Sequence, residues 1–361
     1  MSAALDDTDD RAESIRMIRD SAAAVAPPGG DTKRVRDLRF KDPGFDRATL
    51  RQMGEMGWIG LRVPEERGGA GLGMGEACAL AEALGAGLVP EPLIPCALSA
   101  GLLAALGGAG PLDKALAGEV AVLTAWQERA DTLDVPGTRD APRRFVPMAA
   151  GADLFLVPVR EGGGKLALYA QPASGADVAI ERTQDGGNLG TLRPNVGGAE
   201  KLAEDAEAAL AAALDEAALA TAAYLLGAME RAFAMITDYL KTRQQFGRII
   251  GTFQALQHRA ADLAMQIALT RASVEAAAAS LDAGATGDAR RAVVSRAKAR
   301  AAEASLAVTR GCVQLSGGIG YTDDYDVGLY LRKAMVLANQ YGSAALHRRR
   351  FMALAPESDE Q

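Results

Sequence analysis

Two segments in the last third of the chain carry side chains suited to holding a phosphate-bearing ligand. The first, YLKTRQQFGRIIGTFQALQHRAAD, places Arg243, Gln245, Phe246 and Gln254 around a glycine. Arginine is permanently charged, and its planar fork of donors matches a pyrophosphate. The two glutamines are neutral donors, and the phenyl ring offers a flat apolar surface. Taken alone, an RxxFG motif is short, and it also fits a plain helix–helix corner with a solvated arginine.

The second segment, QLSGGIGYTDDY, is a glycine turn that includes Gln314, Gly317, Gly318 and Gly320. Glycine has no Cβ, so the backbone can turn sharply there or approach a ligand closely. The flanking sequence has a helical pattern, whereas the dinucleotide fingerprint opens after a strand. The turn is therefore not a Rossmann motif, and by itself it is weak evidence for a cofactor.

Length and composition limit the classes of protein that can carry these segments. A chain of 361 residues favours two or three domains, and 49% hydrophobic with 24% charged residues is ordinary for a globular protein. The formal charge of −7 argues against a nucleic-acid partner. We find no apolar run long enough to span a bilayer and no signal-peptide pattern, so we expect a cytoplasmic protein with no membrane span.

The cysteines and histidines do not form a metal-binding pattern. Three cysteines lie far apart, the odd count fits a reducing compartment, and only two histidines are present. We therefore predict no metal site. Cys312 lies in an apolar helix and is expected to be buried and inert. His258 lies near an apolar stripe and is expected to be a packed core histidine.

The sequence pattern indicates helices, then strands, then helices. We predict a mainly α fold with an N-terminal helical domain (1–118), a middle antiparallel β domain (119–199) and a C-terminal four-helix bundle (200–361). In the middle region REGGGK separates two strand-like runs, which indicates a hairpin. The glycine- and alanine-rich helix MGEACALAEALGAGL is expected to pack closely on a neighbour. The HRRR run from His347 is expected to end the last helix.

Two long helices show apolar stripes with steps of mostly three and four residues. One stripe follows Leu226, Met229, Phe233, Ile236 and Leu240, and the other follows Phe253, Leu256, Ala260, Leu263, Ile267 and Val274.

In combination these motifs resemble one known family. RQQFGRIIGTFQALQH followed by QLSGGIGYTDDY resembles the C-terminal domain of the acyl-CoA dehydrogenases. GWIGLRVPEERGGAGLG resembles the N-terminal domain of that family. The helix–sheet–helix order also agrees, so the resemblance covers nearly the whole chain.

The resemblance implies an FAD-linked oxidation of an acyl-CoA thioester to the 2,3-enoyl-CoA, in which a carboxylate takes the α-proton and the β-hydride moves to the flavin. In this family FAD lies across a subunit boundary, and a neighbouring chain contacts its ADP half. The resemblance therefore implies an oligomer, either homo- or hetero-oligomeric. The residues that it assigns to cofactor contacts are Arg243, Gln245, Phe246, Gln254, Gln314, Gly317, Gly318 and Ser343.

The catalytic base of the family is missing from its usual place. Many members carry glutamate in a Tyr-Glu-Gly-Thr segment, whereas the matching segment here has Tyr341 in that position. A phenol with a pKa near 10 is a poor proton acceptor at neutral pH. Other members place the glutamate on the helix before RxxFG, and that position falls on Ala217. Glu216 is adjacent but turned by about 100 degrees, so it is a candidate base whose alternative is a solvated carboxylate.

Other departures concern the flavin ring and the substrate. The Thr-Glu-Pro and Gly-Ser-Asp segments of the family are replaced by TAWQERADTLDVPG, where Trp126 is either a stacking residue or a core residue. The arginine that usually follows the helix-borne base is Ala218, whereas Ser343 keeps one polar position.

Features that serve a neighbour's ADP half are kept, so our leading hypothesis is the base-deficient subunit of a hetero-oligomer. A homo-oligomeric dehydrogenase using Glu216 and a non-dehydrogenating CoA- or FAD-binding member are the alternatives. The sequence leaves open the acyl chain, the electron acceptor and the choice between dimer and tetramer.

Overall fold

The computed structural model describes residues 2–108 and 110–355, with side chains from residue 11 onward. These residues form two compact units. Within the described residues, the first unit combines 2–32, 74–89 and 218–355, and the second combines 33–73, 90–108 and 110–217. The predicted division at residues 118 and 199 stays a prediction.

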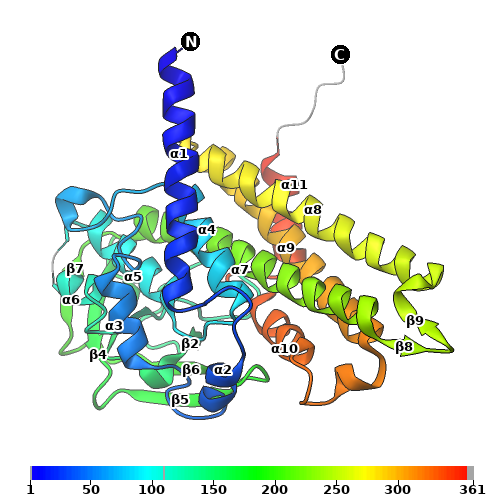
Figure 1. The fold of residues 1–361 in the computed structure, drawn as a ribbon. Coiled ribbons are helices and arrows are strands. Elements are labelled where there is room, and N and C mark those ends of the chain that lie inside the picture. The colour runs from blue at the N-terminus through cyan, green and yellow to red at the C-terminus, as the bar shows by residue number, and fades with distance from the viewer. Residues whose placement is uncertain (1, 109, 356–361) are drawn as a thin grey trace. The chain divides into compact units, whose positions relative to one another are not determined.

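The first unit is built from long helices (Figure 1). Its helices include α1 (Ser2–Ser21), α4 (Met74–Ala86), most of α7 (Glu207–Thr242), α8 (Gln254–Asp282), α9 (Gly287–Ser316), α10 (Val327–Leu337) and α11 (Ala344–Leu354). A short hairpin joins α7 to α8, and α9 returns alongside α8. The predicted C-terminal bundle is confirmed. Both predicted stripes face inward, since their residues are buried or half-buried throughout.

Helices α4 and α7 cross at backbone contact. A Cβ added at Gly85 would lie 2.0 Å from the carbonyl oxygen of Tyr224. One added at Gly227 would lie 1.8 Å from the carbonyl oxygen of Glu82. No side chain larger than hydrogen fits at either position, so the expected close packing of the small-residue helix is confirmed.

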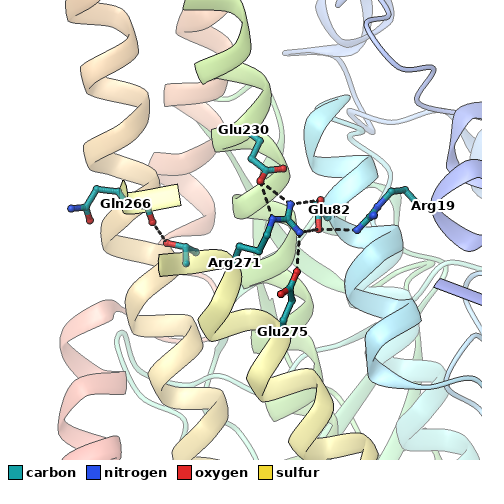
Figure 2. Close-up of polar contacts among 7 residues, drawn as sticks. Arg19, Glu82, Glu230, Gln266, Arg271 and Glu275 are labelled. Atoms are coloured by element: carbon teal, nitrogen blue, oxygen red, sulfur yellow. Dashed lines mark hydrogen bonds and ion pairs between the residues drawn. The ribbon is translucent and has the colours of Figure 1, made fainter. Parts of the chain in front are cut away.

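A network centred on Arg271 lies beside this crossing (Figure 2). Arg271 on α8 donates from Nη2 to Glu82 Oε1 on α4 at 2.7 Å and to Glu230 Oε1 on α7 at 2.7 Å. Its Nη1 donates to Glu275 Oε1 at 3.2 Å, and Arg19 Nη2 on α1 lies 3.5 Å from Glu82 Oε2. The Arg271 guanidinium therefore joins α8, α4 and α7. Glu82 also connects these helices to α1 through Arg19.

Helix α7 is long and apolar enough to cross a membrane by length and composition alone, which departs from the expectation that no such run exists. Its apolar window is 72% buried inside the protein. Such burial is typical of the core helix of a bundle, in which apolar residues surround the whole helix.

The second unit carries two sheets and short helices. The helices are α2 (Lys33–Leu38), α3 (Arg47–Glu55), α5 (Leu93–Ala105) and α6 (Leu112–Leu116). One sheet has the order β1 (Val122–Thr124), β3 (Leu154–Arg160), β4 (Leu166–Pro172), β7 (Glu200–Ala203). The other has the order β2 (Arg143–Pro147), β6 (Asn188–Arg193), β5 (Asp177–Arg182). Strand pairs are antiparallel except for β1 with β3, which are parallel.

The hairpin predicted at REGGGK is confirmed, because Arg160 pairs with Leu166 across it. The predicted start of the last helical region near Glu200 is wrong. Residues Glu200–Ala203 form β7, and α7 begins at Glu207. The strand exists because β4 has a free edge to pair with, and that tertiary partner overrides the weak strand propensity of EKLA.

We expect Arg271→Met to lower the free energy of unfolding by about 1–3 kcal/mol, because Glu82 and Glu230 lose their shared donor while remaining partly buried. Glu275 is 64% exposed, so Glu275→Gln is the matched control and should change stability by less than about 0.5 kcal/mol. Urea unfolding of both variants tests this. Equal, small losses would show that the network does not stabilise the bundle.

Candidate cofactor-contact site

A tight hairpin carries the RxxFG motif between α7 and α8. Strands β8 (Gln244–Gln245) and β9 (Arg248–Ile249) pair antiparallel, leaving Phe246 and Gly247 as a two-residue loop. Both loop residues have positive φ, +54° and +76°, as in a type I′ turn. A bulky residue at positive φ is strained. Phe246 is also 88% exposed, so burial within this chain does not offset the strain.

The polar side chains of this segment point to solvent. Arg243, Gln245 and Gln254 are all exposed. Among the residues that the structure describes, Arg243 has no ion-pair partner, in contrast to Arg271. The ring of Phe253 lies under the Arg248 guanidinium at 4.0 Å and meets Phe246 edge-on at 6.1 Å. The short hairpin thus exposes one cation without an ion-pair partner among the described residues, Arg243, together with the neutral hydrogen-bond donor Gln245.

The glycine turn follows α9 as a 3-10 segment, η5 (Gly317–Tyr321). Gly317 has φ +66° and ψ −146°, a region almost exclusive to glycine. Gly318 has no positive φ, and nothing in the chain lies within 4 Å of a Cβ built on it. Neither the backbone nor internal packing therefore requires a glycine at 318. Its open surface leaves room for an external group to approach the backbone closely.

Both motifs lie at the same end of the first unit. Helix α8 leads away from the hairpin and α9 returns beside it (Figure 1), with Gly311 packed against Leu263. The loop after η5 is tied to α7 because Tyr325 donates its hydroxyl to the Met235 carbonyl at 3.0 Å. The exposed Gln314 and the 75%-exposed Tyr321 belong to this end as well. The donor chemistry and open glycines here fit a pyrophosphate and the ribose beside it.

The turn between α10 and α11 carries Tyr341 and Ser343. Tyr341 is buried and has a φ of +56°. The Ser343 hydroxyl accepts from the Leu346 amide at 3.2 Å and caps α11. A cofactor contact by Ser343 stays a prediction.

Lys298 is a buried charged residue that the sequence analysis missed. It is fully buried on α9 and donates from Nζ to the carbonyl oxygens of Ala338 at 2.9 Å, Gly342 at 3.0 Å and Leu337 at 3.4 Å. Burial lowers its pKa to about 7. A lysine within RAKARAAEA has the pattern of a solvated helix face. The available signal was the small residues beside it, which allow α10 and α11 to cover that face.

Glu216 lies in the third turn of α7 and is engaged by the same unit. Its Oε1 accepts from Arg62 Nη2 at 2.9 Å, and Oε2 lies 3.4 Å from Arg62 Nε. Arg62 also donates to the Leu72 carbonyl at 3.2 Å. The carboxylate therefore anchors the segment before α4 to α7. Ala217 and Ala218, the next positions, are buried.

An internal ion pair holds Glu128, which lies in the segment TAWQERADTLDVPG. Arg143 is fully buried, 3.2 Å from Glu128, and donates to the carbonyls of Thr138 at 2.8 Å and Pro158 at 2.9 Å. Glu128 accepts from the Thr138 amide at 2.7 Å. Trp126 is buried, in accordance with the core alternative.

Two sequence expectations are wrong. His258 is exposed, because the inward stripe of α8 passes through Leu256 and Ala260 on either side of it. HRRR does not end the last helix, since α11 continues to Leu354. There His347 is buried, and Arg348 pairs with Glu303 on α9.

The expectation for Cys312 is confirmed, since burial raises its pKa to about 12. Among the described residues no group of His, Cys, Asp or Glu side chains could hold a metal ion.

We expect the buried lysine to make stability pH-dependent. The pKa of Lys298 is about 7 in the folded chain and 10.5 ordinarily. Between these values the unfolded chain binds a proton that the folded chain has lost, so stability rises with pH; below pH 7 both forms are protonated and the slope disappears. Relative to Lys298→Met, the wild-type chain should gain stability between pH 7 and pH 9 in urea unfolding. Lys241→Met, at an exposed lysine, is the control, and parallel pH curves for wild type and Lys298→Met would contradict the assignment.

Comparisons with known proteins agree with this geometry. Residues 207–353 match the acyl-CoA dehydrogenase C-terminal domain, and residues 12–110 match the N-terminal domain. Acyl-CoA dehydrogenase IpdE2 of Mycolicibacterium smegmatis is 32% identical over 336 residues, which cover 92% of this chain and 94% of the relative.

Two solved structures share the fold over nearly the full length. The ChsE4-ChsE5 complex from Mycobacterium tuberculosis superposes with a TM-score of 0.84 at 27% identity, over 95% of this chain and 98% of that one. A variant of the Tcur3481-Tcur3483 steroid ACAD gives a TM-score of 0.84 at 29% identity, over the same shares of the two chains. With both terminal domains matched and a relative aligned along almost its whole length, the chain belongs to the acyl-CoA dehydrogenase family, whose cofactor is FAD.

Proposed function

We propose that this chain is the subunit of a hetero-oligomeric acyl-CoA dehydrogenase that lacks the catalytic glutamate. It would close the ADP side of an FAD site whose flavin ring is held by a partner chain. One observation carries the proposal. Arg243, which has no ion-pair partner among the described residues, and the open Gly318 backbone lie at the same end of the bundle. Glu216, the acidic group nearest a base position, is engaged in an ion pair.

Neither base position of the family holds a free carboxylate in this chain. Tyr341 brings a phenol to one of them, and that phenol is a weak proton acceptor at neutral pH. At the other, Ala217 is buried, and the neighbouring Glu216 is held by Arg62. FAD when bound supplies the hydride acceptor. The residues of this chain would bind and orient its diphosphate, and the partner would supply the α-proton acceptor.

The length of α7 supports a cofactor shared between chains. Glu216 is 27 positions before Arg243, the residue that follows the last turn of the helix. At a rise of about 1.5 Å per residue, the two are separated by roughly 40 Å along the helix. A base at Glu216 and a diphosphate contact at Arg243 of the same chain are therefore too far apart to serve one FAD molecule. Arg243 can instead contact the diphosphate of a cofactor bound in another subunit.

The buried Arg143–Glu128 pair supports the absence of a flavin-ring pocket in this chain. In the family the corresponding loop offers backbone and hydroxyl donors to the flavin. Here Glu128 of the replacing segment and the buried Arg143 are engaged with each other, and they also bond to the amide and the carbonyl of Thr138. Releasing them would leave a buried charge unpaired, which is costly.

Two similar structures favour a two-chain assembly and a bulky substrate. One is the complex of ChsE4 with ChsE5, and the other is the Tcur3481-Tcur3483 steroid ACAD. By analogy we extend the proposal to a bulky, steroid-type acyl-CoA thioester, oxidised between its α and β carbons.

We expect Arg243→Ala to weaken FAD retention about 10- to 100-fold in the complex formed on co-expression with a second acyl-CoA dehydrogenase-like chain, because a charge-assisted bond to phosphate is lost. Flavin absorbance per complex and FAD titration measure this. Arg291→Ala, at an exposed arginine near the start of α9, is the control. Unchanged FAD affinity in the Arg243 variant would show that Arg243 does not contact the diphosphate.

We expect Gly318→Val to leave the melting temperature of the isolated chain nearly unchanged, because the new side chain meets nothing within 4 Å at its Cβ. The same variant should lower FAD content of the complex at least about tenfold, since the side chain blocks close approach to the backbone. Full FAD content in this variant would show that the turn does not contact the cofactor.

We expect Glu216→Gln to leave turnover of the complex within about twofold. A loss of about 10²- to 10⁴-fold, the usual contribution of a general base, would establish the self-sufficient alternative. CoA-thioester binding without flavin reduction in any co-expressed complex would favour the non-dehydrogenating alternative.

A further inference from the structure

Helix α8 carries a second apolar face, on the side away from the stripe that packs inward. Met265 and Leu269 are each 56% exposed, and exposed alanines continue the same face at steps of three and four residues. The central positions of this outer α8 face are Ala261, Ala264, Met265, Ala268, Leu269 and Ala272. In Figure 1 the helix runs along the outside of the bundle. An outer helix face is ordinarily polar, so a continuous exposed apolar face indicates a surface that binds another protein.

The outer α8 face is complementary in shape to a second copy of itself that runs antiparallel. In a two-fold symmetric pair, a residue that contacts a second position is matched by the same contact in reverse. If the axis lies level with the midpoint between residues 266 and 267, Met265 of one copy lies level with Ala268 of the other. Leu269 then lies level with Ala264. Each bulky side chain therefore meets a small one, which is the alternation that lets two helices pack closely.

The polar residues at the ends of this face favour the antiparallel arrangement over a parallel one. Glu275 lies on the same face, one turn beyond Ala272, and is 64% exposed. In a parallel pair the two Glu275 carboxylates would meet, and such like-charge contacts oppose association. In the antiparallel pair they are about 25 Å apart along the helix. Each carboxylate then lies level with the exposed Gln257 and His258 of the other copy, whose side chains carry N–H donors.

We propose that two copies of this chain pair through their outer α8 faces, antiparallel about a two-fold axis between Gln266 and Ile267. An assembly that contains this chain therefore contains it at least twice, whatever other chain it includes. The pairing needs neither FAD nor an unlike chain. It can be measured on the full-length chain alone, and it does not depend on the result for Arg243→Ala.

Cross-linking between single cysteines tests the orientation and the register. Ala261 and Ala272 lie level with each other across the proposed axis, and both are exposed. Full-length Ala261→Cys that carries a size tag is mixed with untagged Ala272→Cys under mild oxidation. We expect a disulfide between the two variants. Neither variant should link to itself, because identical positions lie about 16 Å apart, whereas a disulfide needs Cα atoms within about 7 Å.

The wild-type chain is the background control, since its three cysteines, Cys78, Cys96 and Cys312, are buried. A parallel pair would link identical positions, and a face that no second copy covers would give no link. Either result would overturn the proposal.

A charge placed on the face tests the pairing without cysteines. We expect Leu269→Glu to raise the dissociation constant for self-association at least about a hundredfold, because each copy would bury an unpaired carboxylate in the contact. Sedimentation velocity over a range of protein concentrations measures this. Met352→Glu makes a similar change at a residue that is 77% exposed on α11 and should leave association unchanged. Undiminished association of Leu269→Glu would contradict the pairing. A monomeric wild-type chain, in which Leu269→Glu blocks only binding of an unlike chain, would assign the face to that chain instead.

Discussion

The backbone contact between α4 and α7 is the constraint on which the first unit depends. At Gly85 and Gly227 the helices approach so closely that any Cβ would collide with a carbonyl of the other helix. Arg271 then bridges the same pair of helices from α8, through Glu82 and Glu230. Because packed helices are stiff, fixing the crossing also fixes the direction of α7 and of the hairpin that follows it.

Two strained residues in this unit are supported in opposite ways. Phe246 and Tyr341 both have left-handed backbones, with φ of +54° and +56°. Tyr341 is buried, and Lys298 and His347 hold the backbone carbonyls of Gly342 and Tyr341, so contacts within the chain offset the strain. Phe246 stands almost wholly in solvent at the tip of a two-residue loop. A bulky ring held in that position gains contacts only when something outside the chain covers it, in agreement with a shared cofactor or partner surface.

Sequence periodicity and turn residues correctly predicted the features of the fold that depend on local structure. The stripe through Leu256 and Leu263 and the hairpin at REGGGK follow from spacing alone, and so did the glycine-rich close contact. The features that the sequence did not predict depend on contacts with residues distant in the chain. Lys298 resembles a solvated residue until α10 and α11 cover it, and Glu216 has no visible role until Arg62 is brought beside it. The strand at Glu200 exists only because β4 offers an edge.

The two halves of a dehydrogenase site place different demands on a chain. A diphosphate-binding surface needs an unpaired cation, hydrogen-bond donors and backbone without side chains. All of these can be exposed to solvent before the ligand binds. A base needs a carboxylate that is free to accept a proton at one point over the substrate. In this chain Glu216 is bonded to Arg62, whereas Arg243 has no ion-pair partner among the described residues. Because Glu216 lies near the start of α7 and Arg243 just after its end, a change at one position leaves the other undisturbed. This separation is consistent with our proposal of a subunit that binds the diphosphate and leaves the base to a partner chain.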